Sequence, residues 1–145
     1  MISFDTNLLF YSLNPGSIWH GAAVAFLQEQ LSRPGMRVVL TDYLLVELYV
    51  LLRNPAVMAQ PLSAKAARDL VTAYWDIPSV MRVEHAIVMD EVWEAAGAKA
   101  FAHRRIFDAR LALTLRRSGV THFATANVAD FQGWGFEKVW NPLVT

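Results

Sequence analysis

Short apolar runs alternate along the chain with longer stretches of helical periodicity. The short runs, bounded by turn-forming residues, predict strands at residues 1–4, 38–41, 80–83, 122–124 and 138–140. Apolar residues spaced three or four positions apart predict helices at residues 20–32, 43–53, 63–74, 86–98 and 106–118. Because strands that alternate with helices form βαβ units, the pattern predicts an α/β fold with a mainly parallel sheet. In such a sheet, ligands bind at the carboxyl ends of the strands.

Turn and cap residues mark the ends of several of these elements. Asp5, Thr6 and Asn7 close the first strand and lead into a further helix. Asp42 is expected to cap the helix at 43–53, and Gly119 to end the helix at 106–118. The prolines and glycines punctuate elements, and we find no internal repeat and no evident linker. We therefore expect a single domain over residues 1–145.

The composition is unusually apolar for a soluble monomer. Hydrophobic residues make up 54% of the chain and the mean hydropathy is +0.27, so we expect some apolar surface to be covered by a partner, although a tightly packed single core would give a similar composition. The longest apolar stretch, residues 43–52, contains Glu47 and is shorter than the roughly 20 residues that a bilayer needs, so no membrane association is expected. The amino terminus lacks the basic region of a signal peptide, and the cytoplasm is the expected location.

Charge and cysteine content narrow the possible chemistry. The formal net charge is zero, so contact with nucleic acid must depend on local basic residues such as His103, Arg104 and Arg105. The chain has no cysteine, which excludes disulfides, thiolate metal sites and a cysteine nucleophile. The search for a reactive site therefore turns to the carboxylates.

Three carboxylates occupy positions that are unusual for ionised side chains. Asp5 ends an apolar strand, Glu47 falls in the apolar stripe of its helix, and Asp108 lies on the inner face of the helix that begins near residue 106. Each has a structural alternative: a helix cap for Asp5, a paired or edge position for Glu47, and a favourable helix-dipole position for Asp108. If the three converge, a cation must offset their charges. An all-oxygen ligand set favours Mg²⁺ or Mn²⁺ over zinc, and such a site performs phosphoryl transfer.

Several short segments resemble the motifs of one known family. They lie at residues 2–7, at 46–48 preceded by Thr41, at 106–112, at 125–131 and at 139–142, in the family's order and without a large gap. Together they resemble the PIN-domain family, and within it the VapC-type toxins of prokaryotic toxin–antitoxin pairs. The fourth segment departs from the common pattern, because many members carry an acid where this chain has Asn127, and here the acid follows at Asp130.

The resemblance implies a three-layer α/β/α fold around a mainly parallel sheet of four to five short strands. It also implies an endoribonuclease that depends on Mg²⁺ or Mn²⁺, cleaves single-stranded RNA, forms a homodimer and is blocked by a cognate antitoxin. We expect Asp5, Glu47, Asp108 and Asp130 to form the catalytic site, with Asp5, Glu47 and Asp108 as the metal ligands. Thr6, Thr125 and Asn127 are expected to support these ligands, and His103, Arg104 and Arg105 to bind RNA.

Other functions remain compatible with the sequence. A PIN-like nuclease of RNA processing, which has no antitoxin, would carry the same motifs. A catalytically degenerate module that binds RNA or protein is a second alternative, because Asn127 replaces a common acid. A receiver-like signalling domain is disfavoured, because it needs an acidic pair after the first strand and a lysine near the site, and this chain has Asp5 alone there.

Overall fold

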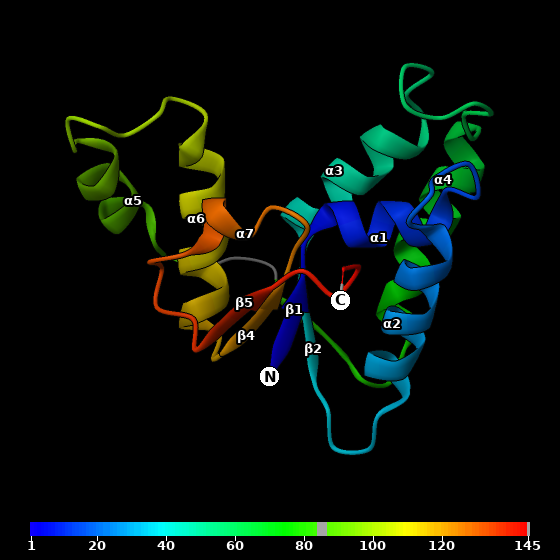
Figure 1. Cartoon of the computed structure of the whole chain (residues 1–145), viewed down its shortest axis with the longest axis horizontal. Helices are drawn as coiled ribbons and strands as arrows, with labels where there is room; N and C mark the ends of the chain where they lie inside the picture. Colours follow the sequence, from blue (N-terminus) through cyan, green and yellow to red (C-terminus); the bar gives the residue numbers. More distant parts are fainter. Residues whose placement is uncertain (84–86, 145) are drawn as a thin grey trace.

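A computed structural model describes residues 1–83 and 87–144 of the chain. Its elements follow in the order β1 (Ile2–Phe4), α1 (Thr6–Leu13), α2 (His20–Ser32), β2 (Val38–Thr41), α3 (Asp42–Leu52), α4 (Ala64–Ala73), a short 3-10 helix (Tyr74–Asp76), β3 (Val80–Val83), α5 (Met89–Ala96), α6 (Arg105–Arg117), β4 (His122–Ala124), α7 (Val128–Phe131) and β5 (Lys138–Trp140). Figure 1 shows this arrangement.

The strands form one parallel sheet in the order β3-β2-β1-β4-β5. Strand β1 lies at the centre of the sheet. Strands β2 and β3 follow on one side of it, and β4 and β5 on the other. All five carboxyl ends meet at one edge, because the strands are parallel. This confirms the predicted sheet and brings the segments that follow β1 and β4 together.

Helices cover the sheet on both sides. Figure 1 shows α1, α2 and α4 on one side and α5 and α6 on the other, as expected of a three-layer α/β/α fold. Within the described residues, no helix is long and apolar enough to cross a membrane.

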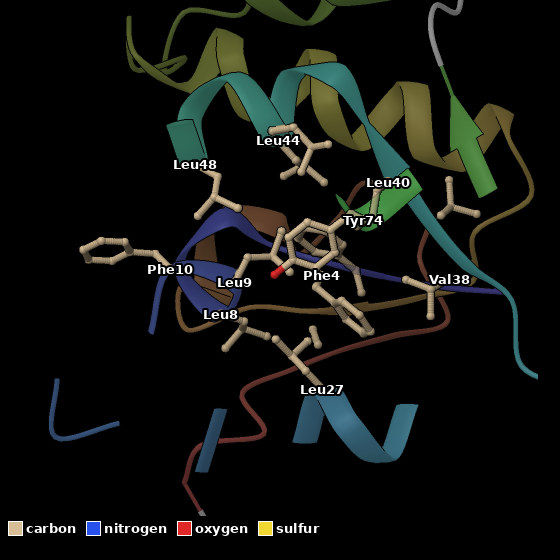
Figure 2. Close-up of a cluster of buried hydrophobic side chains, with 14 of the residues drawn as sticks. Phe4, Leu8, Leu9, Phe10, Leu27, Val38, Leu40, Leu44, Leu48 and Tyr74 are labelled. Atoms are coloured by element: carbon tan, nitrogen blue, oxygen red, sulfur yellow. The ribbon is translucent and has the colours of Figure 1, made fainter. Parts of the chain in front are cut away.

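The main core lies between the central strands and the helices α1, α2 and α3. Phe4 of β1, Leu40 of β2 and Leu48 of α3 are fully buried there. Figure 2 shows them with their neighbours Leu8, Leu9, Phe10, Leu27, Val38, Leu44 and Tyr74. A smaller cluster of Val88, Val92 and Ala109 joins α5 to α6. These contacts fix the positions from which the candidate site residues project.

The predicted helix ends agree with the structure except at two places. Asp42 does not cap α3: the cap is Thr41, which leaves β2 in an extended conformation and whose side chain accepts a hydrogen bond from the Leu44 amide. Helix α5 spans Met89–Ala96 rather than residues 86–98, so both of its predicted ends are wrong, and residue 86 lies outside the described part of the chain. Gly119 has a φ of 88° just after α6, which confirms its role in ending that helix.

Candidate active site

Asp5 lies at the carboxyl end of β1 and caps helix α1. Its Oδ1 accepts a hydrogen bond of 2.8 Å from the Thr6 amide, and its Oδ2 accepts one of 2.6 Å from the Thr125 hydroxyl. The Asn7 side-chain amide donates to the same Oδ2 at 3.2 Å. Burial raises the pKa of Asp5, with smaller contributions from the charges of Glu47 and Asp130, while these hydrogen bonds oppose the shift. Asp5 is therefore both a helix cap and part of an acidic cluster.

Glu47 does not lie on the buried side of α3, so the prediction of a carboxylate inside the apolar stripe is wrong. The buried side of α3 is formed by Leu44, Leu45, Leu48 and Leu52. Glu47 is exposed beside them. The helix packs on the core through that buried side and turns Glu47 toward the open end of the sheet. There its Oε2 accepts a hydrogen bond of 2.7 Å from the Thr6 hydroxyl.

Asp108 and Asp130 come from the other side of the sheet. Asp108 stands half-buried in the first turn of α6, and Asp130 is exposed in α7. The pKa of Asp108 is raised to about 6, first by burial and then by the negative charges of Asp130, Asp5 and Glu47. The structure therefore brings the four predicted carboxylates together, and all four line one open pocket of about 650 Å³.

The segment after β4 supports Asp5. Besides donating to Asp5, the buried Thr125 hydroxyl accepts a hydrogen bond of 2.9 Å from the Asn127 amide. The Asn7 side-chain oxygen accepts a bond of 3.3 Å from the Ala126 amide. These bonds join the two neighbouring strand ends. Thr6, Thr125 and Asn127, expected from the sequence to support the ligands, all lie next to the carboxylates.

The three basic residues predicted to bind RNA differ in their surroundings. His103 and Arg104 are exposed just before α6. Arg105 is half-buried, its guanidinium lies 5.3 Å from the centre of the Trp134 ring, and its charge lowers the pKa of Asp108. Of the three, Arg105 therefore has a direct electrostatic link to the acidic cluster.

Sequence reasoning missed a second basic residue beside the carboxylates. Arg110 lines a smaller pocket together with Asp5, Glu47 and Asp108, and its guanidinium lies 3.9 Å from the centre of the Tyr43 ring. Tyr43 is on α3 and Arg110 on α6, so their contact exists only in the folded chain. The sequence carried no local signal for it.

The donor chemistry of the pocket fits a hard divalent cation. Within residues 1–83 and 87–144, no three histidine, aspartate or glutamate side chains lie close enough to hold one ion together. Mg²⁺, however, usually takes one or two carboxylates as direct ligands and keeps several waters. Asp5 and Asp108 both have pKa values raised partly by neighbouring carboxylates, which indicates negative charge that a cation would offset.

Comparison with known proteins agrees with this fold. No protein-family model matches the chain. Ribonuclease VapC24 of Mycobacterium tuberculosis, found in two strains, is 43% identical over 145 residues, which cover 100% of this chain and 99% of the relative. The crystal structure of VapC20 from Mycobacterium tuberculosis, a toxin that cleaves the sarcin-ricin loop, superposes with a TM-score of 0.64 at 20% identity, covering 85% of this chain and 87% of that one.

The two similarities establish different things. The VapC20 structure shows only that the fold is shared, because an identity of 20% supports no closer comparison. The likeness to VapC24 extends over the whole chain. It confirms the resemblance noted in the sequence, and the chain belongs to the VapC family of PIN-domain toxin ribonucleases.

Proposed function

We propose that this chain is a divalent-metal-dependent endoribonuclease whose active site contains Asp5, Glu47, Asp108 and Asp130. The observation that carries the proposal is the convergence of these carboxylates, from four separate elements, on one pocket at the carboxyl edge of the sheet. Nothing in the packing of the core requires four like charges there, and their mutual repulsion opposes folding. Such a cluster is expected where negative charge serves a bound cation.

Asp5, Glu47 and Asp108 are the proposed ligands of Mg²⁺ or Mn²⁺, directly or through water. Nucleases of this family generally depend on a metal ion, and oxygen-only donors favour these two ions over zinc. When bound, the ion would polarise the phosphate, activate the attacking water and stabilise the leaving oxygen. Cleavage should therefore stop in EDTA and return with Mg²⁺ or Mn²⁺. Full activity in the chelator, or restoration by zinc alone, would contradict the proposal.

The chain's own residues would orient the ligands. Thr125 and the Thr6 amide hold the two oxygens of Asp5, and the Thr6 hydroxyl holds Glu47. Asn127 lines the same pocket as Asp130, and its proposed role is to bind a water. Asp130 completes the acidic side of the pocket. We expect a water molecule and not one of these side chains to attack the phosphate, so that hydrolysis proceeds without a covalent intermediate.

A single RNA strand is the expected substrate, guided by a basic rim that includes His103, Arg104 and Arg105. The chain has no net charge, so binding must come from such a local group. Charge reversal at Arg104 and Arg105 together should weaken RNA binding and flatten its dependence on salt. If the binding of RNA is unchanged over a salt series, these arginines have no part in the rim.

A protein partner is expected to cover the apolar side of the same pocket. Val46, Val50 and Val57 are exposed there, on α3 and in the segment after it. An amphipathic helix of an antitoxin is a suitable occupant, because such helices bind through their hydrophobic face. We therefore propose that the chain is a cytoplasmic toxin with a cognate antitoxin. Co-expression with the product of the adjacent upstream gene tests this: it should co-purify and relieve growth arrest. If it does neither, the chain is a nuclease without an antitoxin.

A homodimer is the second expected assembly, since the composition is more apolar than a small monomer requires. Light scattering of the isolated protein at tens of micromolar, a concentration that roughly marks a weak interface, should give the mass of two chains. A monomer at that concentration would contradict the proposed dimer.

A further inference from the structure

Two arginines of α6 share an unusual environment on either side of Asp108. Arg105 lies over the Trp134 ring, with 5.3 Å between its guanidinium carbon and the ring centre, and Arg110 lies over the Tyr43 ring at 3.9 Å. In both side chains the Nε is buried and has no hydrogen-bond partner among the described residues. A buried donor without a partner is uncommon and calls for an explanation.

Neither arginine has an acidic partner in the described part of the chain. By contrast, Arg68, Arg82 and Arg117 form ion pairs with Asp69, Asp42 and Glu91. An arginine stacked on an aromatic ring keeps its hydrogen-bonding edge available and loses little side-chain freedom when that edge is used. Both guanidinium groups are therefore positioned by an aromatic ring and not by an ion pair.

The two aromatic rings belong to different segments around the acidic cluster, and Trp134 donates a hydrogen bond from its Nε1 to the Asp130 carbonyl oxygen. Tyr43 belongs to α3, the helix that carries Glu47, and Trp134 follows α7, the helix that carries Asp130. Arg110 lines the pocket that also contains Asp5, Glu47 and Asp108, whereas the charge of Arg105 acts on Asp108. Asp108 thus shares α6 with two arginines, and neither of them forms an ion pair with a carboxylate of the described residues.

We infer that Arg105 and Arg110 are a pair of phosphate-binding groups that hold the RNA backbone on both sides of the acidic pocket. The inference rests on the proposed ribonuclease function and adds a second site, at Arg110, to the predicted rim. Guanidinium groups bind phosphate through two parallel hydrogen bonds, and neither of these two groups is engaged in an ion pair with a carboxylate of the described residues. Each arginine would hold a phosphate next to the one that is cut, and the carboxylates would act on the phosphate between these two.

The binding of a short fluorescein-labelled single-stranded RNA, measured over a series of KCl concentrations, tests the inference. The Asp5→Asn chain is used throughout so that the RNA stays intact. Arg105→Gln and Arg110→Gln should each weaken binding about tenfold, as loss of one charge-assisted hydrogen bond does. Each should also reduce the slope of log K against log salt by about 0.7, the value for one phosphate contact on a single strand.

Arg37→Gln is the matched control. Arg37 is exposed just before β2, at the opposite edge of the sheet, so this variant loses the same charge without touching the pocket. It should leave the slope unchanged. Tyr43→Phe should bind RNA normally because the ring remains, and Tyr43→Leu should bind as weakly as Arg110→Gln. Thermal unfolding of each variant checks that the chain is folded.

Two results would overturn the inference. The first is a salt slope for the Arg105→Gln and Arg110→Gln variants equal to that of Arg37→Gln, while the wild-type chain still cuts RNA; the ribonuclease function would then stand without the arginine pair. The second is normal RNA binding by both variants together with lost binding of the product of the adjacent upstream gene. That result would assign the arginines to binding of this protein. If the wild-type chain neither binds nor cuts RNA, the proposed function and the inference both fail.

Discussion

The Thr125 hydroxyl donates a hydrogen bond of 2.6 Å to Asp5 Oδ2, which joins the carboxyl ends of β4 and β1. Both residues are buried, and the bond lowers the pKa of Asp5 against the opposing effect of burial. Thr125 therefore favours the ionised form of Asp5 and fixes one of its oxygens, as the proposed role of Asp5 as a metal ligand requires.

Thr125→Val, which keeps the shape of the side chain, should lower RNA cleavage about 10- to 100-fold, the usual effect of losing a group that orients a metal ligand. The loss should appear as a higher Mg²⁺ concentration for half-maximal activity, because the hydroxyl acts through Asp5. Thr125→Ser retains the hydroxyl and should recover most of the activity. Equal Mg²⁺ requirements in the valine variant and the wild-type chain would show that the hydrogen bond has no part in metal binding.

Asp108→Asn should stabilise the metal-free protein while it abolishes cleavage. The folded-state pKa of Asp108, about 6, lies above its ordinary value, so the folded chain binds a proton more readily than the unfolded chain does. Stability in EDTA should therefore be higher near pH 5 and fall as the pH rises through about 6. After allowance for solvent screening, the gain from Asp108→Asn near pH 7.5 should be about 1 kcal/mol, or a rise in Tm of about 2–4 °C.

Asp69→Asn is the control for this prediction. Asp69 is exposed and its pKa is lowered by hydrogen bonds from Lys65 and Arg68, so its replacement should give no stabilisation. Thermal unfolding of both variants in EDTA near pH 5 and near pH 7.5 makes the comparison. A destabilised Asp108→Asn protein near pH 7.5 would show that repulsion among the carboxylates is not a cost to the fold.

The orientation of α3 can be tested with two substitutions on that helix. Leu48 is fully buried, whereas Val46 is 63% exposed beside Glu47. Leu48→Ala should cost about 2–5 kcal/mol in the free energy of unfolding, as core truncations do, and Val46→Ala should cost less than about 0.5 kcal/mol. Denaturant unfolding measures both. Similar costs at the two positions would show that Val46 is as buried as Leu48, which would contradict this orientation of α3.

The sequence predicted the layout of the fold well because the relevant signals are local. The five strands are short apolar runs, and the ends of the helices carry recognisable residues, such as Ser63 at the start of α4 and Gly119 after α6. Asp42 was misassigned as a cap because aspartate and threonine are both favoured at that position. The backbone conformation at the end of β2, which the sequence does not display, gives the role to Thr41.

The sequence predicted which carboxylates form the candidate site, but it did not predict the contacts that their neighbours make. Asp5, Glu47, Asp108 and Asp130 lie in motifs that can be read one at a time. The burial of Glu47 was overestimated because α3 is apolar on nearly every side, so its periodicity does not say which side faces the core. The contact of Arg110 with Tyr43 depends on how α3 and α6 meet, and no local pattern reports that.

Cleavage of a labelled single-stranded RNA by the purified wild-type and Asp5→Asn chains, each with Mg²⁺ and with EDTA, tests the central claim most directly. Asp5→Asn keeps the size of the side chain and an oxygen to accept the Thr6 amide that caps α1, so the variant should fold. The account predicts cleavage by the wild-type chain with Mg²⁺ and none in the other three samples. Wild-type rates of cleavage in the folded Asp5→Asn variant would contradict it and move the active site elsewhere on the protein.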